Sequence, residues 1–350
     1  MKRSLLFLMM LLLIGSVSLF GQQKKFSLYA VGFYNQENLF DTCHDAGKND
    51  YEFLPTGSYH WNGMKYTHKL HNMAQVLAEM GTDILPQSIG CTLIDLSEIE
   101  NDRVLNDLVA QEPLKARGYK FCHIEGPDVR GVDCALLYNP KLFSVRNVKL
   151  IPYIYEPKDS AHKTRGFLTV SGTLAGEHVT VIVNHWPSRF AVSYYRERAG
   201  YQCRSVKDSL LREDPSCKVI IMGDMNDDPT DKSMAEALGA RQEIKDVKDN
   251  EMYNPWWNTL AKDGTGTLAY NGSWNLFDQI VLSPGLLNRD GSKDYSALKY
   301  YKHQIFRRDY LFQTEGKYKG TPKRTTAGGV WLDGYSDHLP TIVYLIKEQK

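Results

Sequence analysis

The sequence has no strong excess of charge of either sign. Its 42 basic and 41 acidic residues nearly cancel over 350 residues, and without residues 1–21, which include Lys2 and Arg3, 40 basic residues face 41 acidic ones. A nucleic-acid-binding protein usually carries a basic footprint. Any such footprint must therefore be local, and the balance argues against a tight, non-specific DNA binder.

The sequence also lacks paired cysteines of the metal-binding kind. Its six cysteines include no C-x-x-C pair, which argues against a zinc site. Cys122 and Cys134 flank the loop "IEGPDVRG" almost symmetrically, so they could form a disulfide across a hairpin. Disulfides are permitted in an exported protein, which the N-terminal segment described next predicts. Buried free thiols are the default expectation for the other four.

Long apolar runs are absent except at the start. Lys2 and Arg3 precede an almost wholly apolar stretch from Leu5 to Phe20, and Gly21 leads into a polar segment. This pattern predicts a cleaved signal peptide over residues 1–21. The alternative is an uncleaved anchor, for which about 16 apolar residues is short. We expect a secreted or periplasmic protein with no membrane span after cleavage.

Internal repeats and low-complexity linkers are absent too, so residues 22–350 are predicted to form a single domain. Apolar periodicity alternates between strand-like and helix-like segments. Helices are predicted over 68–80, 102–114 and 193–213, and strands lie in 27–40, 91–101, 119–124, 132–138, 166–186, 219–222, 266–283 and 336–346. This mixture predicts an α/β fold with two stacked sheets and outer helices, although a doubly wound sheet fits as well.

Polar residues suited to metal or phosphate chemistry stand at the ends of seven apolar runs. Each one alone could have a purely structural role, such as a helix cap, a turn residue or a solvated residue at a sheet edge. The ordered set is more specific than its members: Asn35 with Glu37 and Asn38, Glu98 with Glu100, Asp133, His185, Asp224 with Asn226, Asp278, and Asp337 with His338.

The motifs "YNQENLFD", "LSEIEN", "VNHWPSR", "GDMNDDP", "FDQIVLS" and "GYSDHLP" occur in that order. This series resembles the endonuclease/exonuclease/phosphatase superfamily over nearly all of residues 26–350. The resemblance implies the deoxyribonuclease I-like fold, a four-layer α/β sandwich of two packed mixed β-sheets flanked by helices. The segment 81–101 is longer than the family pattern, which leaves Glu100 as the alternative to Glu98.

The resemblance also implies phosphate-ester hydrolysis assisted by a hard divalent cation, Mg²⁺ or else Mn²⁺ or Ca²⁺. Glu98, with Asn35 and Asp337, matches the metal-binding positions. Mg²⁺ prefers carboxylate and water oxygens and needs only one or two carboxylates. The residue types therefore suit the implied cation.

Catalytic roles follow from the same motif positions. Asp224 matches the residue that orients or deprotonates the attacking water, and Asn226 would hold Asp224 and the phosphate. His338 matches the histidine that contacts the scissile phosphate, and Asp278 would fix its tautomer. His185 would donate a hydrogen bond to a phosphate oxygen or to the leaving oxygen.

Arginines and further carboxylates complete the predicted site. Arg189 and Arg130 are predicted to bind phosphate oxygens through paired hydrogen bonds, and Arg196 is either a third such ligand or an exposed salt-bridge partner. Asp133 would hold Arg130 or another site residue. We expect "DDPT" to turn into a helix that Asp228 or Thr230 caps.

The substrate is not fixed by the fold. A secreted nuclease acting on DNA or RNA is the first expectation, because residues 301–329 are basic and aromatic and Tyr253, Trp256 and Trp257 offer rings for base stacking. A phosphatase, or a phospholipid or sugar-phosphate diesterase, is the alternative. A non-catalytic binding protein would show gaps in the motif set, and none is present. The protein is expected to be a monomer that binds nucleic acid or another phosphate ester.

Overall fold

The computed structural model describes residues 24–156 and 162–349, so the predicted signal peptide lies outside the described residues. Two large mixed sheets dominate it. The first has the order β14-β17-β1-β2-β4-β3, with bounds Lys299–Ile305, Thr341–Glu348, Phe26–Leu39, Leu93–Ile99, Asp133–Tyr138 and Lys120–His123. The second has the order β5-β6-β7-β8-β13-β10-β9, with bounds Phe143–Ile151, Phe167–Leu174, Glu177–His185, Lys218–Asp224, Asp278–Leu282, Met252–Tyr253 and Ala240–Arg241.

Strand β1 shows why the sheets must be covered on both faces. Its alternate side chains point to opposite faces, and both faces are apolar. Val31 and Phe33 pack into the core between the two sheets, whereas Ala30 and Tyr34 pack under the helices outside the first sheet. A strand buried on both faces needs a layer on each side, which predicts the stacking that is observed.

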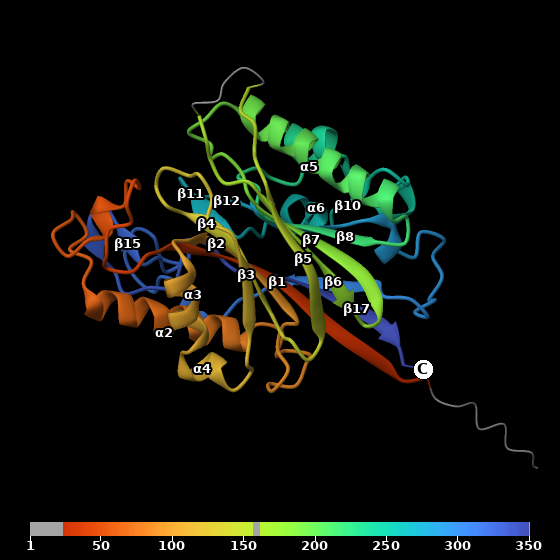
Figure 1. The fold of residues 1–350 in the computed structure, drawn as a ribbon, viewed down its shortest axis with the longest axis horizontal. Coiled ribbons are helices and arrows are strands. Elements are labelled where there is room, and N and C mark those ends of the chain that lie inside the picture. The colour runs from red at the N-terminus through yellow and green to blue at the C-terminus, as the bar shows by residue number, and fades with distance from the viewer. Residues whose placement is uncertain (1–23, 157–161, 350) are drawn as a thin grey trace, which may run out of the picture.

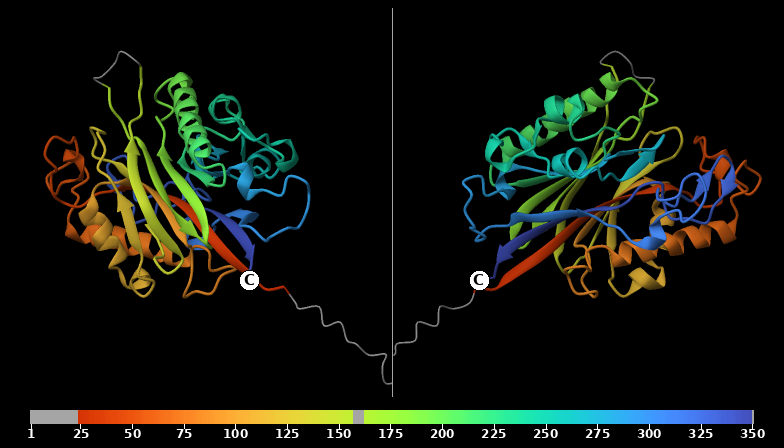
Figure 2. Two further views of the ribbon diagram at one scale, coloured as in Figure 1. Left: turned by 45° about the vertical axis from the view of Figure 1, so that its right-hand side comes forward. Right: turned by 180° about the vertical axis from the view of Figure 1, so that it is seen from behind.

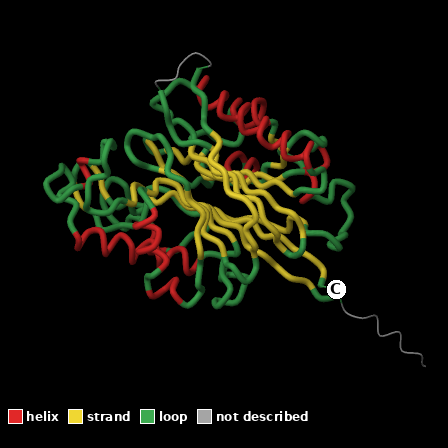
Figure 3. The backbone as a smooth tube through the Cα atoms, viewed as in Figure 1, coloured by secondary structure: helices red, strands yellow, loops and turns green. Residues whose placement is uncertain are grey.

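Helices form the two outer layers, and Figures 1 and 3 show the strands enclosed between them. Helices α2 (Gly63–Glu79), α3 (Asp102–Val109) and α4 (Glu112–Lys115) lie beside the first sheet, and α5 (Ser193–Glu213) packs on the second. The helix α6 (Trp256–Ala261) is short. This arrangement confirms the predicted deoxyribonuclease I-like α/β sandwich.

Helix boundaries differ from the sequence pattern where local hydrogen bonds intervene. Helix α2 begins before residue 68 because the Asn62 side chain accepts a hydrogen bond from the Lys65 amide and caps the helix. The helix predicted over 102–114 is divided into α3 and α4 around Gln111, with Pro113 in the first turn of α4. Proline suits such a position because its missing N–H would have no partner there.

Several shorter elements connect the sheets. The strands β11 and β12 form one hairpin and β15 and β16 another, with bounds Leu268–Tyr270, Ser273–Asn275, Thr326–Ala327 and Val330–Trp331. Single helical turns or short helices occupy Tyr51–Phe53, Ser233–Leu238, Ile244–Asp246, Pro284–Leu286 and Asp309–Leu311. The strands β5 and β14, at sheet edges, were not predicted, because their half-exposed residues show little apolar periodicity.

The six cysteines are free thiols. The register of β3 and β4 places Leu136 opposite Cys122, so Cys134 does not lie across from it and the considered disulfide is not formed. Among the described residues, no helix is long and apolar enough to cross a membrane.

Sheet topology gathers the polar strand ends at one place. Strands β1 and β2 run parallel, as do β7 and β8, so their carboxyl ends meet at the same edges. Asp224 at the end of β8 is in register with His185 of β7 and with Asp278, the first residue of antiparallel β13. The site is therefore assembled at one end of the two sheets.

Candidate active site

His338 and Asp278 form a buried hydrogen-bonded pair. The Nδ1 atom of His338 lies 2.9 and 2.8 Å from the two carboxylate oxygens of Asp278. Its Nε2 atom faces Asp224, at 3.8 Å from Oδ2. Burial by itself lowers the pKa of His338, but the charges of Asp278 and Asp224 outweigh it and hold that pKa well above its ordinary range. The imidazole is thus fixed as a cation with one N–H directed into the site.

Asp224 occupies the centre of the site. Its Oδ1 accepts a hydrogen bond from the Asn226 amide at 2.9 Å, and its Oδ2 accepts one from Asn35 Nδ2 at 3.1 Å. Burial, together with repulsion from Asp278, raises the pKa of Asp224 to about 7, although the charge of His338 opposes this. A carboxylate with a pKa near neutrality is well matched to accepting a proton.

The glycine before Asp224 is required by a close backbone approach. Gly223 has φ +151°, and a Cβ atom there would overlap the carbonyl oxygen of Asn184 on β7. Asn226, two residues on, has φ +52° and donates from Nδ2 to the Trp186 carbonyl oxygen at 3.0 Å. The close contact at Gly223 and the hydrogen bond of Asn226 hold the end of β8 against β7, and they fix the position of Asp224.

Asn35 and Glu98 meet at the adjacent ends of β1 and β2. Asn35 Nδ2 lies 3.4 Å from Glu98 Oε1, and the Asn38 amide donates to Glu98 Oε2 at 2.8 Å. Glu98 has φ +60° at an irregularity in the pairing with β1 and β4. Backbone strain of this kind costs about 1–3 kcal/mol and tends to mark functional sites.

The same irregularity separates Glu98 from Glu100. In a regular strand the two side chains would point to one side, but the pairing with β4 is irregular here and Glu98 has a positive φ. Glu100 Oε2 instead accepts the Asp41 amide at 2.7 Å. Burial and the neighbouring carboxylates of Asp41, Asp45 and Asp50 raise the pKa of Glu100 to about 8. The structure therefore places Glu98, and not the alternative Glu100, beside Asn35.

His185, the last residue of β7, lies near the carboxylates of Glu98 and Asp224. Its Nε2 is 3.8 Å from both Glu98 Oε1 and Asp224 Oδ2. Burial, and then the charges of Arg165 and Arg130, hold the pKa of His185 well below its ordinary range. His185 is thus a neutral imidazole, in contrast to His338, and its N–H can serve as a hydrogen-bond donor.

Asp337 is held by an arginine that the sequence motifs did not reveal. Arg324 donates from Nη2 to Asp337 Oδ2 at 3.0 Å and from Nε to Glu37 Oε1 at 3.1 Å. Burial and the charge of Asp337 raise the pKa of Glu37 to about 7, while burial lowers the pKa of the nearby Lys69 to about 8. Only the tertiary fold brings these residues together, since 287 positions separate Arg324 from Glu37.

The two predicted phosphate-binding arginines have different surroundings. The guanidinium of Arg189 donates to the Asn226 carbonyl at 3.1 Å and lies 3.0 and 2.8 Å from carboxylate oxygens of Asp228 and Asp231. Arg130 is half exposed, and the one carboxylate contact of its side chain among the described residues is a longer one, 3.5 Å from Nε to Asp128 Oδ1. Arg130 therefore keeps more of its donors available than Arg189 does.

Arg165 is a further basic residue of the site that sequence reasoning missed. It is buried and donates from Nη1 to Asp128 Oδ2 at 2.8 Å and from Nη2 to the Trp186 carbonyl at 3.0 Å. Asp128 in turn lies next to Arg130. Arg165 thus ties the loop that carries Arg130 to the segment after His185.

Three secondary expectations need correction. Asp133 accepts the Gly126 amide at 3.0 Å and does not hold Arg130. Arg196 is a buried structural residue, because its Nε lies 2.7 Å from Asp227 Oδ1. Neither Asp228 nor Thr230 caps a helix. Asp228 Oδ1 accepts the Leu276 amide at 2.7 Å, and the helix from Ser233 has no side-chain cap.

Of the three rings proposed for base stacking, Trp256 and Tyr253 pack in or against the core, whereas Trp257 is only partly buried on α6 and stays a prediction. Trp256 is fully buried between the sheets and donates from Nε1 to the Ile280 carbonyl. Tyr253 packs against Tyr300, with 5.3 Å between ring centroids. Both rings contribute to the core, so they offer no stacking surface.

The donor set at this end of the sheets fits a hard cation. Ligand atoms of Asp224, Asp278 and His338 lie within 4.8 Å of one another. His338 Nδ1 is already hydrogen-bonded to both oxygens of Asp278, however, so these three residues are a less suitable metal site. Glu98 Oε1 has only longer contacts, 3.4 Å to Asn35 and 3.8 Å to His185. An oxygen ligand with loose neighbours can accommodate Mg²⁺.

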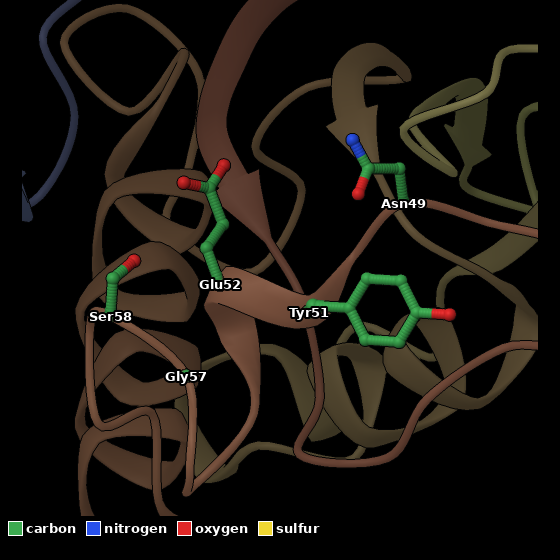
Figure 4. Close-up of a pocket in the computed structure, with 5 residues that line it drawn as sticks. All are labelled: Asn49, Tyr51, Glu52, Gly57 and Ser58. Atoms are coloured by element: carbon green, nitrogen blue, oxygen red, sulfur yellow. The ribbon is translucent and has the colours of Figure 1, made fainter.

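A pocket elsewhere on the surface carries no comparable chemistry. Figure 4 shows it in the loop after β1, where it has a volume of about 410 Å³ and is lined by Asn49, Tyr51, Glu52, Gly57 and Ser58. A single carboxylate and no basic residue line it. The constellation around Asp224 is therefore the stronger candidate.

Comparison with known proteins agrees with this geometry. A model of the endonuclease/exonuclease/phosphatase family matches residues 30–347. The chain belongs to this family. No curated protein sequence matches it.

Solved structures share the fold at low sequence identity. An endonuclease/exonuclease/phosphatase family protein from Bacteroides thetaiotaomicron has a TM-score of 0.55 and 14% identity, covering 93% of this chain and 97% of that one. The mannosyl-6-phosphatase of the same organism has a TM-score of 0.54 and 15% identity, covering 91% and 99%. TDP2 from D. rerio, complexed with a single-strand DNA product, has a TM-score of 0.50 and 14% identity, covering 91% and 99%.

Proposed function

We propose that the protein is a divalent-metal-dependent nuclease that hydrolyses phosphodiester bonds of DNA or RNA. The observation that carries the proposal is the buried line Asp278–His338–Asp224, which ends beside Asn35 and Glu98. It combines a fixed cationic donor, a carboxylate of near-neutral pKa and an oxygen-rich ligand pair. Metal-assisted hydrolysis of a phosphate ester can use these three components as a phosphate ligand, a proton acceptor and a cation site.

Mg²⁺, or else Mn²⁺ or Ca²⁺, would be held by Glu98 with Asn35 and Asp337. The cation would stabilise charge on the phosphate. Asp337 keeps Oδ1 free of short contacts, since its nearest ionic neighbour there is His338 Nε2 at 3.9 Å. Arg324, on the other oxygen, orients the Asp337 carboxylate.

Other side chains of the site would transfer protons and bind the phosphate oxygens. Asp224 accepts the proton of the attacking water, and Asn226 keeps that carboxylate in place through its backbone amide. His338 donates from Nε2 to a phosphate oxygen while Asp278 holds its Nδ1 proton. His185, which is neutral, donates to a second oxygen. A positioned acid or base contributes about 10²- to 10⁴-fold in rate.

Phosphate contacts are assigned to Arg130 first and to Arg189 second. The half-exposed guanidinium of Arg130 has its Nη atoms without acidic partners among the described residues. For Arg189 to bind phosphate, the substrate would have to replace its contacts with Asp228 and Asp231. That exchange is costly, so we assign Arg189 chiefly to holding the loop after Asp224.

Support for nucleic acid comes from the solved complex of D. rerio TDP2 with single-strand DNA. The phosphatase from B. thetaiotaomicron keeps a sugar-phosphate monoester as the second candidate. The apolar residues 5–20 support export, with a signal peptide over 1–21 and a mature monomeric domain over 22–350.

The test compares plasmid DNA, RNA, bis-p-nitrophenyl phosphate and a sugar monophosphate, each with Mg²⁺ and with EDTA. EDTA-sensitive cleavage of a nucleic acid supports the proposal. Cleavage of the sugar phosphate alone would move the assignment to a phosphatase. The substitutions Asp224→Ala and His338→Ala should abolish turnover, and mutant activity equal to that of the wild type would refute the site.

A further inference from the structure

A second feature beside the site is an arginine held between two aromatic rings. The guanidinium carbon of Arg307 lies 4.6 Å from the ring centroid of Phe312 and 5.6 Å from that of Trp274. Arg307 is exposed, and among the described residues no carboxylate lies within ion-pair distance of it. A guanidinium stacked on rings keeps its in-plane N–H donors free to bind an anion.

Among the described residues, the neighbouring Arg308, unlike Arg307, is paired with carboxylates. Arg308 also stacks on a ring, that of Phe306 at 4.2 Å, but it is neutralised by Glu79 at 3.2 Å and Asp83 at 2.7 Å. Both arginines are cations, but Arg308 is paired with two carboxylates. Arg308 holds the segment to α2, whereas nothing acidic among the described residues engages Arg307.

The segment 306–325 that carries both arginines is attached near each end to the motif "GYSDHLP" (334–340). At its start, the Phe306 amide donates to the Pro340 carbonyl at 2.8 Å, and near its end Arg324 contacts Asp337 at 3.0 Å. Figure 2 shows this C-terminal part of the chain, in blue, next to the orange loops that follow β1. The segment has six basic residues and two acidic ones, so it supplies a local positive charge.

Trp274 reaches the same motif from a different part of the chain. It belongs to the hairpin β11–β12, whose residue Leu268 forms a β-bridge with His338. The Leu339 amide also donates to the Thr267 carbonyl at 2.8 Å. At the tip of the hairpin, Tyr270 is 68% exposed, but it pairs with Ser273 whereas Trp274 pairs with Ala269, so the two rings lie on opposite faces of the hairpin.

We propose that Arg307 and Trp274 form a subsite for the nucleotide next to the scissile phosphate of a single-stranded nucleic acid. Arg307 binds the neighbouring phosphate, and the part of the half-buried Trp274 ring that reaches solvent stacks on the base. The inference rests on the proposed nuclease function and makes it more specific. A substrate with one phosphate group leaves Arg307 without an anion, so the subsite selects polynucleotides over sugar monophosphates.

The experiment compares Arg307→Gln with the matched control Arg308→Gln. Binding of a short fluorescent single-stranded DNA is measured by anisotropy over a range of salt concentrations. Hydrolysis of the same DNA and of bis-p-nitrophenyl phosphate is then measured with Mg²⁺. Thermal unfolding shows whether each variant is folded, and Trp274→Leu tests the stacking part separately.

Arg307→Gln is expected to weaken DNA binding about tenfold and to reduce the slope of log affinity against log salt by about 0.7, the value for one phosphate contact on a single strand. The ratio of kcat/KM for DNA to that for the small diester should fall by a similar factor. Trp274→Leu should weaken binding at least about fivefold, as for loss of one stacked base. Arg308→Gln should leave the binding constant and this ratio unchanged.

Equal effects of the two arginine variants, or an unchanged salt slope in a folded Arg307→Gln protein, would overturn the subsite. These outcomes leave the proposed function standing if the wild type still cleaves DNA. A wild type that hydrolyses bis-p-nitrophenyl phosphate but neither binds nor cleaves DNA or RNA overturns the subsite and the nuclease assignment together. The two failures are therefore distinguishable.

Discussion

The Nδ1 atom of His338 lies 2.8 Å from Asp278 Oδ2, although the two residues are 60 positions apart in the chain. Asp278 is also directly opposite Asp224 in the pairing of β13 with β8. One carboxylate therefore neutralises the histidine while its strand neighbour faces the other ring nitrogen. The order Asp278, His338, Asp224 sets both the tautomer and the charge of the imidazole.

Replacement of Asp278 by Asn should keep the shape of this pair and remove its charge. The amide can donate to Nδ1, which would move the imidazole proton to Nε2 and leave the ring neutral. We expect kcat for bis-p-nitrophenyl phosphate to fall about 10²- to 10⁴-fold at saturating Mg²⁺. The double variant Asp278→Asn/His338→Ala should lose little more than His338→Ala alone, because residues that act as a unit are not additive. Additive losses would show that the two act independently.

Glu98→Gln should weaken the metal site selectively. Removal of one anionic oxygen ligand is expected to raise the Mg²⁺ concentration for half-maximal activity about 10- to 100-fold. Glu100→Gln is the matched control, two residues away and pointing to Asp41. Since burial raises the pKa of Glu100 to about 8, this side chain is already largely protonated at neutral pH and the amide should be tolerated. The check is a Mg²⁺ titration of all three proteins. The reverse pattern would assign the metal to Glu100.

The motif order predicted the fold and the main members of the site because those residues lie at strand ends. Asn35, Asp224 and Asp278 follow or begin apolar runs, and sheet pairing brings such ends together. What the pattern could not show is the direction of a side chain at an irregular position. Glu98 and Glu100 are separable only through the positive φ of Glu98.

Loop residues were predicted least well for a related reason. Arg324 and Arg165 reach the site from segments without periodicity, so their ion pairs exist only in the tertiary structure. Trp256 was assigned to a surface because composition does not report burial, and it is part of the core. Arg189 was predicted as a phosphate ligand from its charge, and the sequence could not show that Asp228 and Asp231 contact its guanidinium.

Asp95 should destabilise the protein as the pH rises. It is fully buried on β2, in register with Phe33 and Leu136, and neither carboxylate oxygen has a hydrogen-bond partner among the described residues. Burial and the charge of Asp278 raise the pKa of Asp95 well above its ordinary range. Above about pH 4 the unfolded chain releases this proton while the folded chain keeps it, so the free energy of unfolding falls with rising pH.

Asp95→Asn removes that proton linkage without changing the side-chain shape. The free energy of unfolding of the variant should exceed that of the wild type near pH 8, and the difference should be smaller near pH 4. Urea unfolding at several pH values measures this. A difference that is constant across the pH range would mean that Asp95 does not bind an extra proton in the folded state.

His303 should act with the opposite sign on the acid side. Its Nδ1 lies 2.7 Å from the Tyr300 hydroxyl and its Nε2 lies 3.0 Å from Thr259 Oγ1, with the ring against Trp256. Burial lowers the pKa of His303 to about 4. The unfolded histidine binds a proton below about pH 6.5 and the folded one does not, so stability is retained above that pH and is lost as the pH falls toward 4.

His303→Gln keeps a polar side chain and removes the titration. Its free energy of unfolding should lie below that of the wild type at neutral pH, because two hydrogen bonds are altered, but the gap should close by about 2 kcal/mol between pH 6.5 and pH 4. His71→Gln, at an exposed position on α2, is the matched control for replacing a histidine by glutamine. A gap that stays constant on acidification would show that His303 takes up its proton equally in both states, and that burial against Trp256 does not control its charge.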